Sequence, residues 1–236
     1  MITVNGIKVE IVRKHIKNLH LAVYPPEGRV RVAVPLHITD ENVRLAVINK
    51  LGWIRKQQSR FMSQPRQSKR EYVTGESHFF RGKRYRLDVV EQPGRQRVEV
   101  NSLTRITLYV QRGKDSASRQ RVLEQWYRQQ LKAVLPSLVK KWEEKIGVYV
   151  NECKVKKMRT RWGSCNPLYR RIWLNLELAK KPVDCLEYVI VHEILHLLEP
   201  SHNDNFVALM NRYLPKWRFY KDELNKFPVK HEDWKY

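Results

Sequence analysis

The stretch His192-Glu193-Ile194-Leu195-His196 decides the interpretation of this chain, and His202 follows it six residues later. On an α-helix, residues four apart lie one turn above each other, so His192 and His196 can direct two imidazoles at a single metal ion. Glu193 then lies one residue further round the helix, where a carboxylate can accept a proton from water that the metal activates. This HExxH pattern predicts a zinc site that includes its own catalytic base.

A catalytic zinc site has three protein ligands and keeps its fourth position for water. His202 is the nearest candidate for the third ligand, because Pro200 ends the helix and residues 201–204 (Ser-His-Asn-Asp) have the pattern of a capping box that starts a second helix. His202 would then project from the first turn of that helix. Glu199 and Glu223 are alternative third ligands, since carboxylates replace histidine in other zinc enzymes.

The segment around this motif predicts a buried helix. Residues 182–198 begin with a proline and are apolar nearly all round. Two histidines and a glutamate in such surroundings would each cost about 1 to 3 kcal/mol if they lacked a partner. A shared metal ion accounts for all three, so burial favours a metal site over a chance occurrence of a five-residue motif.

Composition restricts the class of protein. The chain has 236 residues and no run of 18 or more apolar residues, and its first residues lack the charged and apolar segments of a signal peptide. We therefore expect a cytoplasmic protein without a membrane span. Its three cysteines have no CxxC spacing, which argues against a disulfide framework and against a thiolate zinc cluster.

The formal net charge is +22, far above what solubility requires, and it favours association with a polyanion such as DNA. A basic segment with interleaved aromatic residues precedes the predicted zinc helix, and such a mixture can contact phosphates and stack on bases. A solvated basic surface is the alternative, since no known nucleic-acid motif accompanies the segment. Its members are Lys154, Lys156, Lys157, Arg159, Arg161, Trp162, Tyr169, Arg170, Arg171 and Trp173.

We expect an α+β fold in two parts. Residues 1–115 form a β-rich mixed N-terminal lobe in this interpretation, because short apolar runs alternate with turn signals such as Asn5-Gly6. One helix in this lobe begins after Thr39. Its expected apolar stripe consists of Val43, Val47, Leu51 and Ile54.

Residues 116–236 form the expected catalytic domain. A long amphipathic helix begins at Ser116 or Ser118 and ends before Gly147. Residues 171–176 then alternate as a strand should, and a strand beside a metal cleft can pair with an extended peptide. No internal repeat is apparent in the sequence.

Four segments together resemble the YgjP-like metallopeptidase family, which is related to SprT-like proteases. They are residues 161–165, 172–176, 188–196 and 201–206, and residues 80–87 extend the resemblance more loosely into the N-terminal lobe. The resemblance implies a zincin-type catalytic domain that hydrolyses proteins or peptides, with His192, His196 and His202 as zinc ligands and Glu193 as the base. Some SprT-like relatives digest proteins crosslinked to DNA, and the basic charge here is consistent with a DNA-associated role.

The predicted reaction is hydrolysis of a peptide bond, in which zinc lowers the pKa of its water towards ~7 and Glu193 passes the proton to the leaving amine. Ligand histidines commonly donate their other N–H to a carboxylate or carbonyl. The candidates for that role are Asp204, Asn175 and Glu199, and those for stabilising the oxyanion are Arg161, Tyr188, Tyr213 and Tyr220.

Two other functions stay open at this point. One is a nucleic-acid-binding module with a structural zinc ion, and the other is a metal-dependent hydrolase of a non-peptide bond. Structural zinc sites usually have four protein ligands, often cysteines. Three histidines with a carboxylate in the position of a base therefore favour an enzyme.

Overall fold

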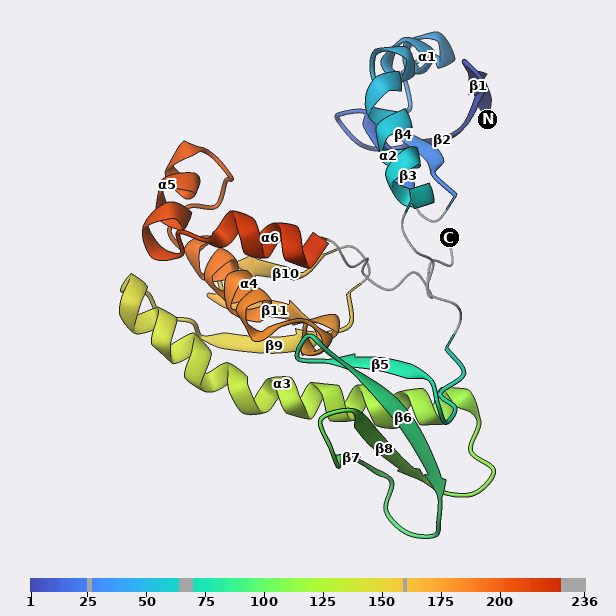
Figure 1. Cartoon of the computed structure of the whole chain (residues 1–236). Coiled ribbons are helices and arrows are strands. Elements are labelled where there is room, and N and C mark those ends of the chain that lie inside the picture. The colour runs from blue at the N-terminus through green and yellow to red at the C-terminus, as the bar shows by residue number, and fades with distance from the viewer. Residues whose placement is uncertain (25–26, 64–69, 159–160, 226–236) are drawn as a thin grey trace. The chain divides into compact units, whose positions relative to one another are not determined.

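The computed structural model describes residues 1–24, 27–63, 70–158 and 161–225 (Figure 1). The fold is α+β, as the sequence predicts, and its contacts divide the chain into two compact units, Met1–Ser68 and Lys69–Tyr236. The expected lobe of residues 1–115 is therefore divided between the two units. The physical reason is that residues 70–115 share a hydrophobic core with the long helix that follows them.

The first unit contains a four-stranded sheet of order β1-β2-β4-β3. Strands β1 (Ile2–Val4) and β2 (Ile7–Lys14) form a hairpin, β4 (Arg29–Pro35) runs parallel to β2, and β3 (His20–Tyr24) runs antiparallel to β4. The turn Asn5-Gly6 has φ angles of 46° and 79°. These positive values confirm the predicted hairpin turn, because a type I′ turn requires φ above zero at both central residues.

Two helices of this unit bury apolar residues against one side of the core. Helix α1 (Asp40–Asn49) begins at the predicted cap Thr39, whose hydroxyl accepts a backbone N–H of the first turn. The expectation of a single helix was wrong, because the backbone leaves helical geometry at Lys50 and a separate helix α2 (Leu51–Ser63) follows. The stripe residues that become fully buried are Val43, Val47 and Ile54.

The second unit begins with another four-stranded sheet, of order β5-β6-β8-β7. Strands β5 (Ser77–Phe80) and β6 (Lys83–Glu91) form a hairpin, β8 (Arg105–Val110) runs parallel to β6, and β7 (Arg97–Val100) runs antiparallel to β8. The hairpin turn Arg81-Gly82 has φ angles of 48° and 79°.

The two sheets have the same topology, which the sequence did not reveal. Each consists of a hairpin, a parallel neighbour and an antiparallel edge strand in the same order, and both hairpin turns share nearly the same pair of positive φ angles. In each case a helix follows the fourth strand in the sequence, with Thr39 or Asp115 as its N-cap. Residues 2–49 and 77–146 therefore share one ββββα arrangement.

The long helix α3 (Ser116–Ile146) joins the second sheet to the rest of its unit. The helix begins at Ser116, one of its two predicted first residues, and its N-cap is Asp115, whose carboxylate accepts the N–H of Ser118. Gly147 ends the helix in the left-handed conformation, as predicted. In Figure 1, α3 extends from the β5–β8 sheet to the α4 region, and its buried face contacts both.

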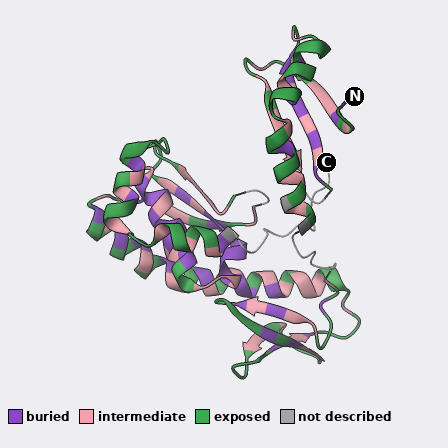
Figure 2. Cartoon of the chain, turned by 45° about the horizontal axis from the view of Figure 1, so that its top comes forward, coloured by how far each residue is buried: buried purple, intermediate pink, exposed green. Residues whose placement is uncertain are grey.

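The remainder of the second unit is a three-stranded sheet with helices on one face. Strand β11 (Arg171–Asn175) lies between β10 (Gly163–Asn166) and β9 (Glu152–Lys156). Figure 2 shows buried residues concentrated where strands and helices face each other. The other elements are the 3-10 helix η1 (Leu176–Lys180) and the helices α4 (Val183–Leu195), α5 (Asp204–Tyr213) and α6 (Trp217–Asn225).

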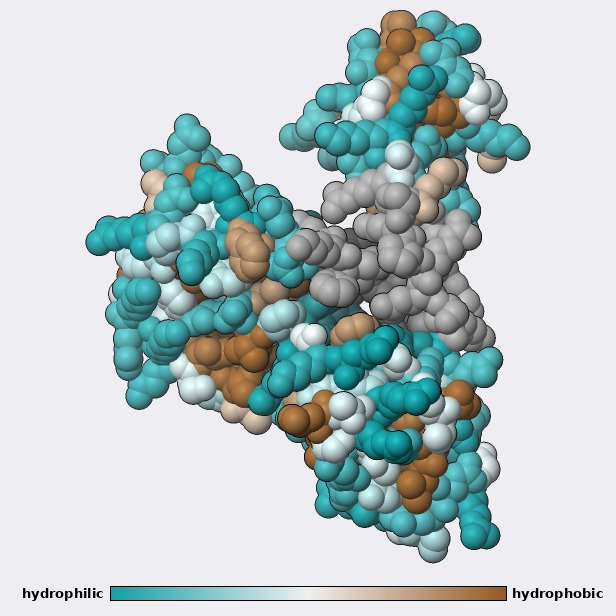
Figure 3. Space-filling view, viewed as in Figure 1, coloured by the Kyte–Doolittle hydropathy of each residue, from teal (hydrophilic) through white to brown (hydrophobic). Residues whose placement is uncertain are grey.

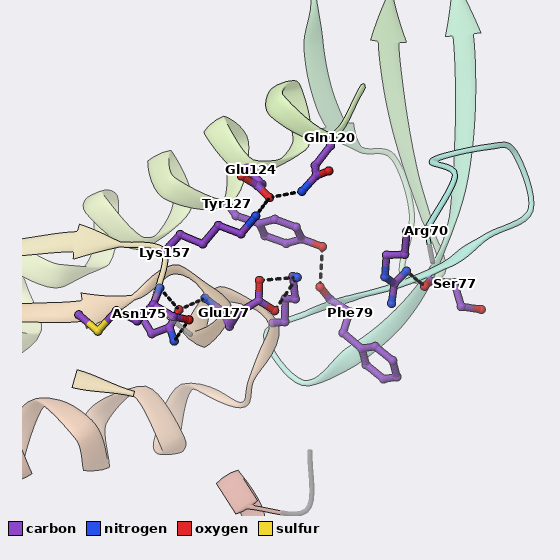
Figure 4. A network of polar contacts seen from close by, with 11 residues as sticks. Arg70, Ser77, Phe79, Gln120, Glu124, Tyr127, Lys157, Asn175 and Glu177 are labelled. Atoms are coloured by element: carbon purple, nitrogen blue, oxygen red, sulfur yellow. Dashed lines mark hydrogen bonds and ion pairs between the residues drawn. The ribbon is translucent and has the colours of Figure 1, made fainter. Parts of the chain in front are cut away.

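Polar contacts attach the β5–β8 sheet to the helical layer (Figure 4). The buried Tyr127 hydroxyl of α3 donates to the carbonyl of Phe79, at 2.8 Å. The turn of the β5–β6 hairpin donates two backbone hydrogen bonds, from Arg81 to Ala179 O and from Gly82 to Lys180 O. This sheet is thereby held close to the start of α4, the helix that carries the HExxH motif.

The surface agrees with the composition. Hydrophilic side chains cover most of the face shown in Figure 3, with apolar areas in both units. Among the residues that the structure describes, no helix is long and apolar enough to cross a membrane.

Candidate metal centre

Three imidazoles converge at the C-terminal end of α4. The possible ligand atoms of His192, His196 and His202 all lie within 4.8 Å of one another, and the Nε2 atoms of His192 and His202 are 2.9 Å apart. The ring centroids are separated by 4.9 Å, 4.9 Å and 4.6 Å for the three pairs. The structure thus brings together the three histidines that the sequence selected.

His202 reaches this cluster from a loop, and not from the first turn of a helix as expected. The N-cap of α5 is Asn203, whose side-chain oxygen accepts the N–H of Phe206 at 3.0 Å. Ser201 is not the cap, because its own N–H donates to the carboxylate of Glu199. His202 therefore lies just before the helix, fixed between the Ser201 contact and the Asn203 cap.

Phe206 is a part of the centre that the sequence analysis missed. This buried residue in the first turn of α5 packs against all three imidazoles, with centroid distances of 5.0 Å to His192, 4.7 Å to His196 and 4.9 Å to His202. A phenyl ring in this position restricts the orientations of the three rings and excludes water from one side. The spacing of Phe206 from His202 could have indicated this contact, because apolar residues in the first turn of a helix commonly pack back onto the preceding loop.

A backbone carbonyl holds the ring of His196. Its Nδ1 atom lies 3.0 Å from the carbonyl oxygen of Glu199, so Nδ1 carries the proton and Nε2 keeps its lone pair. Of the three predicted partners, Glu199 thus contacts a histidine, through its main chain. The fully buried Asn175 has a different role, because its amide donates to the carbonyls of Met158 and Arg161 at 3.0 Å and 2.7 Å.

Burial favours the neutral form of His192 and His196. It lowers the pKa of His192 to about 3, with smaller contributions from the neighbouring charges of His196, His202 and Lys221. The pKa of His196 is lowered as well, again mainly by burial. Neutral imidazoles offer lone pairs to a cation, so the cluster is suited to bind a metal ion near neutral pH.

Glu193 lies beside the cluster on α4 and is only 6% exposed. Burial raises the pKa of its carboxyl to about 8, and the positive charge of Arg161 opposes this shift in part. Gly163 of β10 packs directly against it, since a β-carbon at this glycine would lie 2.5 Å from Glu193 Oε1. A carboxylate with this environment can exchange protons close to neutral pH, as a general base must.

An open cavity of about 630 Å³ adjoins these residues. Its lining includes the HExxH residues of α4, residues 161–165, Pro200 and His202 of the loop before α5, and Lys221 and Leu224 of α6. Two of the four predicted oxyanion candidates, Arg161 and Tyr188, line this cavity. The other two, Tyr213 and Tyr220, pack against the hydrophobic core instead.

The strand arrangement corrects one expectation about peptide binding. Residues 171–175 form the central strand β11, and both of its edges are already paired with β10 and β9. A central strand has no free backbone groups for a peptide. The edge strand that lines the cavity is β10, so an unpaired strand edge beside the cavity belongs to β10 and not to β11.

The chain belongs to the YgjP-like metallopeptidase family, whose metallopeptidase domain model matches residues 17–227. This match confirms the resemblance seen in the sequence and covers most of both units. Membership implies a peptidase that uses a metal ion and acts on proteins or peptides.

Comparison with solved structures finds the metallopeptidase zymogen of Pyrococcus abyssi abylysin, at 15% identity and a TM-score of 0.36. The similarity covers 38% of this chain and 90% of that one. A comparison with curated proteins gives no match. The assignment to a family therefore depends on the family model.

Proposed function

We propose that this chain is a zinc-dependent peptidase of the zincin type, with His192, His196 and His202 as the zinc ligands and Glu193 as the general base. The observation that supports this proposal best is the convergence of three imidazoles beside a buried carboxylate in the lining of an open cavity.

The donor set suits zinc. Tetrahedral zinc with nitrogen ligands at 2.0–2.1 Å places those nitrogens about 3.3 Å apart. The Nε2 atoms of His192 and His202 are 2.9 Å apart, and the possible ligand atoms of all three histidines lie within 4.8 Å of one another. Small side-chain movements would therefore bring these atoms to that geometry. Three protein ligands also leave one coordination position open, which is typical of a catalytic site and not of a structural one.

When bound here, zinc would supply a Lewis acid that polarises the scissile carbonyl and makes water nucleophilic near neutral pH. Glu193 accepts the proton of the attacking water on its carboxylate and then donates it to the leaving amine. Gly163 leaves the space that this carboxylate needs. Arg161 and Tyr188 line the same cavity and can donate hydrogen bonds to the developing oxyanion.

The substrate backbone would be held by the edge strand β10. An extended peptide can add to such an edge through main-chain hydrogen bonds, with its side chains pointing alternately towards and away from the cavity. This placement distinguishes a peptidase from a hydrolase of small esters or nucleotides, which needs no free strand edge.

The test is metal content together with casein cleavage, with and without DNA, for the parent and for Glu193→Gln. We expect one zinc ion per chain in both and cleavage only by the parent. Asp184→Asn is the matched control, since this exposed carboxylate lies at the start of the same helix and should leave activity unchanged. Zinc without cleavage of any protein would favour a structural metal or a non-peptide substrate, and absence of zinc would refute the proposal.

We further infer an association with nucleic acid from one face of the β9–β11 sheet. Helices α3 and α4 pack on the face that buries Val155, Ile172 and Leu174. On the opposite face, the ammonium groups of Lys154 and Lys156 lie 5.8 Å and 5.7 Å from the ring of Trp173. An aromatic ring flanked by cations can stack a base and contact its phosphates.

Binding of labelled single-stranded DNA, followed by fluorescence anisotropy, tests this association. Trp173→Ala should weaken binding about 5- to 100-fold, since stacking of one base contributes about 1 to 3 kcal/mol. Trp53→Ala is the control, because this exposed tryptophan lies on α2 of the first unit. Equal affinities for all three proteins would contradict the inference.

Of the predicted basic segment, Arg159 lies outside the described residues, and Arg161 lines the metal cleft.

A further inference from the structure

We propose that the cleft selects substrates that carry a carboxylate next to the scissile bond, and that Arg161 and Lys221 are the residues that determine this specificity. The proposal rests on the peptidase function above and adds the chemical class of its substrate.

The two cations reach one cavity from different elements. Arg161 lies two residues before strand β10, Lys221 belongs to α6, and the HExxH residues of α4 line the same cavity. Both β10 and α6 contact α4. A substrate that binds in this cavity therefore shares it with two positive side chains.

Among the described residues that line the cavity, Glu193 is the only carboxylate, and it is buried. Within the described part of the chain, neither Arg161 nor Lys221 forms an ion pair. A bound divalent cation would add further positive charge, so the potential in the cleft favours an anionic group.

Both cations share the cavity with the residues that would carry out the reaction. Arg161 and Lys221 line it together with His192 and Glu193. A substrate carboxylate held by either cation would consequently lie in the same cavity as the bond that is hydrolysed.

The backbone that carries Arg161 is fixed. The buried amide of Asn175 donates to the carbonyl of Arg161 at 2.7 Å, and the N–H of Asn175 donates to the carbonyl of Trp162 at 2.9 Å. A cation on an anchored loop loses less conformational freedom when it binds an anion. Arg161 is thus better suited than a mobile surface arginine to recognise a carboxylate.

A carboxylate of this kind has two sources, the side chain of an aspartate or glutamate and the free C-terminus of a peptide. Fluorogenic peptides of one sequence distinguish them. One set carries Glu or Gln at each of the three positions on either side of the scissile bond, and a second set ends in a free carboxylate or in an amide.

Two readouts are needed. The first is kcat/KM of the zinc-loaded parent for each peptide pair. The second is the dissociation constant of the same pairs for zinc-loaded Glu193→Gln, measured by anisotropy, which reports recognition even in the absence of turnover. The specificity variants are Arg161→Met and Lys221→Met, and Lys216→Met is the control, because Lys216 is exposed just before α6 and is not among the residues that line the cavity.

We expect at least one acidic position, or the free C-terminus, to improve kcat/KM and affinity about tenfold over its neutral counterpart. Arg161→Met or Lys221→Met should abolish this preference, and Lys216→Met should retain it. Equal affinities of charged and neutral peptides would overturn the proposal whether or not they are cleaved. Preferential binding without any cleavage would instead refute the peptidase function while sustaining carboxylate recognition.

Discussion

The carboxylate of Glu193 occupies the space in which a side chain at Gly163 would lie. A β-carbon at this glycine would be 2.5 Å from Glu193 Oε1 and 2.9 Å from its Cδ, far closer than real contacts allow. Gly163 belongs to the edge strand β10 and Glu193 to the helix α4. The missing side chain therefore allows strand β10 to pack closely against the carboxylate of Glu193.

Gly163→Ala should displace the Glu193 side chain and abolish most of the peptidase activity. The new methyl group cannot be accommodated without moving the carboxylate, and misplacement of a catalytic group by about 1 Å costs on the order of 100-fold in rate. The metal should stay bound, because the three imidazoles are not in the contact. Steady-state kinetics and zinc content measure the two effects.

Gly52→Ala is the control for that substitution. A β-carbon at Gly52 meets nothing within 4 Å, and the residue lies in helix α2, where alanine is favoured over glycine. This variant should retain activity and stability. If Gly163→Ala were as active as Gly52→Ala, the packing of Glu193 against β10 would have no catalytic importance.

His202→Ala should reduce zinc affinity strongly, because it removes one of the three converging imidazoles. The increase in Tm on addition of zinc depends on the ratio of free zinc to the dissociation constant, so it should largely disappear in this variant. His20→Ala, which removes an exposed histidine of β3, should keep the full increase. An unchanged zinc affinity in His202→Ala would transfer the third-ligand role to Glu199 or Glu223.

Glu193→Gln should stabilise the metal-free protein, and increasingly so as the pH rises from about 4.5 to 8. The folded-state pKa of Glu193 is raised from 4.5 to about 8. In that range the folded protein binds more protons than the unfolded chain, so the free energy of unfolding of the parent falls as pH increases. The stability difference between the two proteins should level off above pH 8 at about 5 kcal/mol.

Denaturant unfolding in the presence of a chelator measures this difference. The pKa of His192 is lowered to about 3, so below pH 6.5 the unfolded chain binds more protons at this residue than the folded protein does. His192 therefore makes the free energy of unfolding rise with pH, in the opposite direction to Glu193. Both proteins share this effect, so it cancels in the comparison. A stability difference that does not depend on pH would contradict the buried, proton-binding state of Glu193.

Gly82→Ala should destabilise the fold more than Gly6→Ala. Both glycines have a φ of 79° in equivalent hairpin turns, so alanine is strained to the same extent in each. Only Gly82 is crowded, since its β-carbon would lie 2.8 Å from Pro182 Cγ, whereas nothing lies within 4 Å at Gly6. The free energy of unfolding should fall by about 1 to 3 kcal/mol more in Gly82→Ala than in Gly6→Ala, as measured by denaturant unfolding. This difference reports how tightly the hairpin packs against the start of α4.

Local patterns accounted for most of the secondary structure. The hairpin at Asn5-Gly6, the cap at Thr39 and the helix end at Gly147 were predicted because each depends on a few adjacent residues. The cap at Asp115, the break at Lys50 and the loop position of His202 were not. At these places several neighbouring residues compete for the same role, and packing with distant elements decides between them.

The sequence by itself determined the candidate chemistry and the family. The residues of the HExxH motif and His202 are close in the chain, and one helix turn and one loop suffice to bring the imidazoles together. The spacing of these residue types was therefore enough to identify the three histidines and the carboxylate before any fold was known.

Only the tertiary structure decided what surrounds that chemistry. Two residues beside the centre, Gly163 and Lys221, come from strand β10 before α4 and from helix α6 after it, and no local pattern links them to the HExxH motif. The repeated ββββα topology was hidden for the same reason, because strand pairing joins residues that are distant in sequence. Such contacts depend on the packing of whole elements against each other, which a linear pattern does not contain.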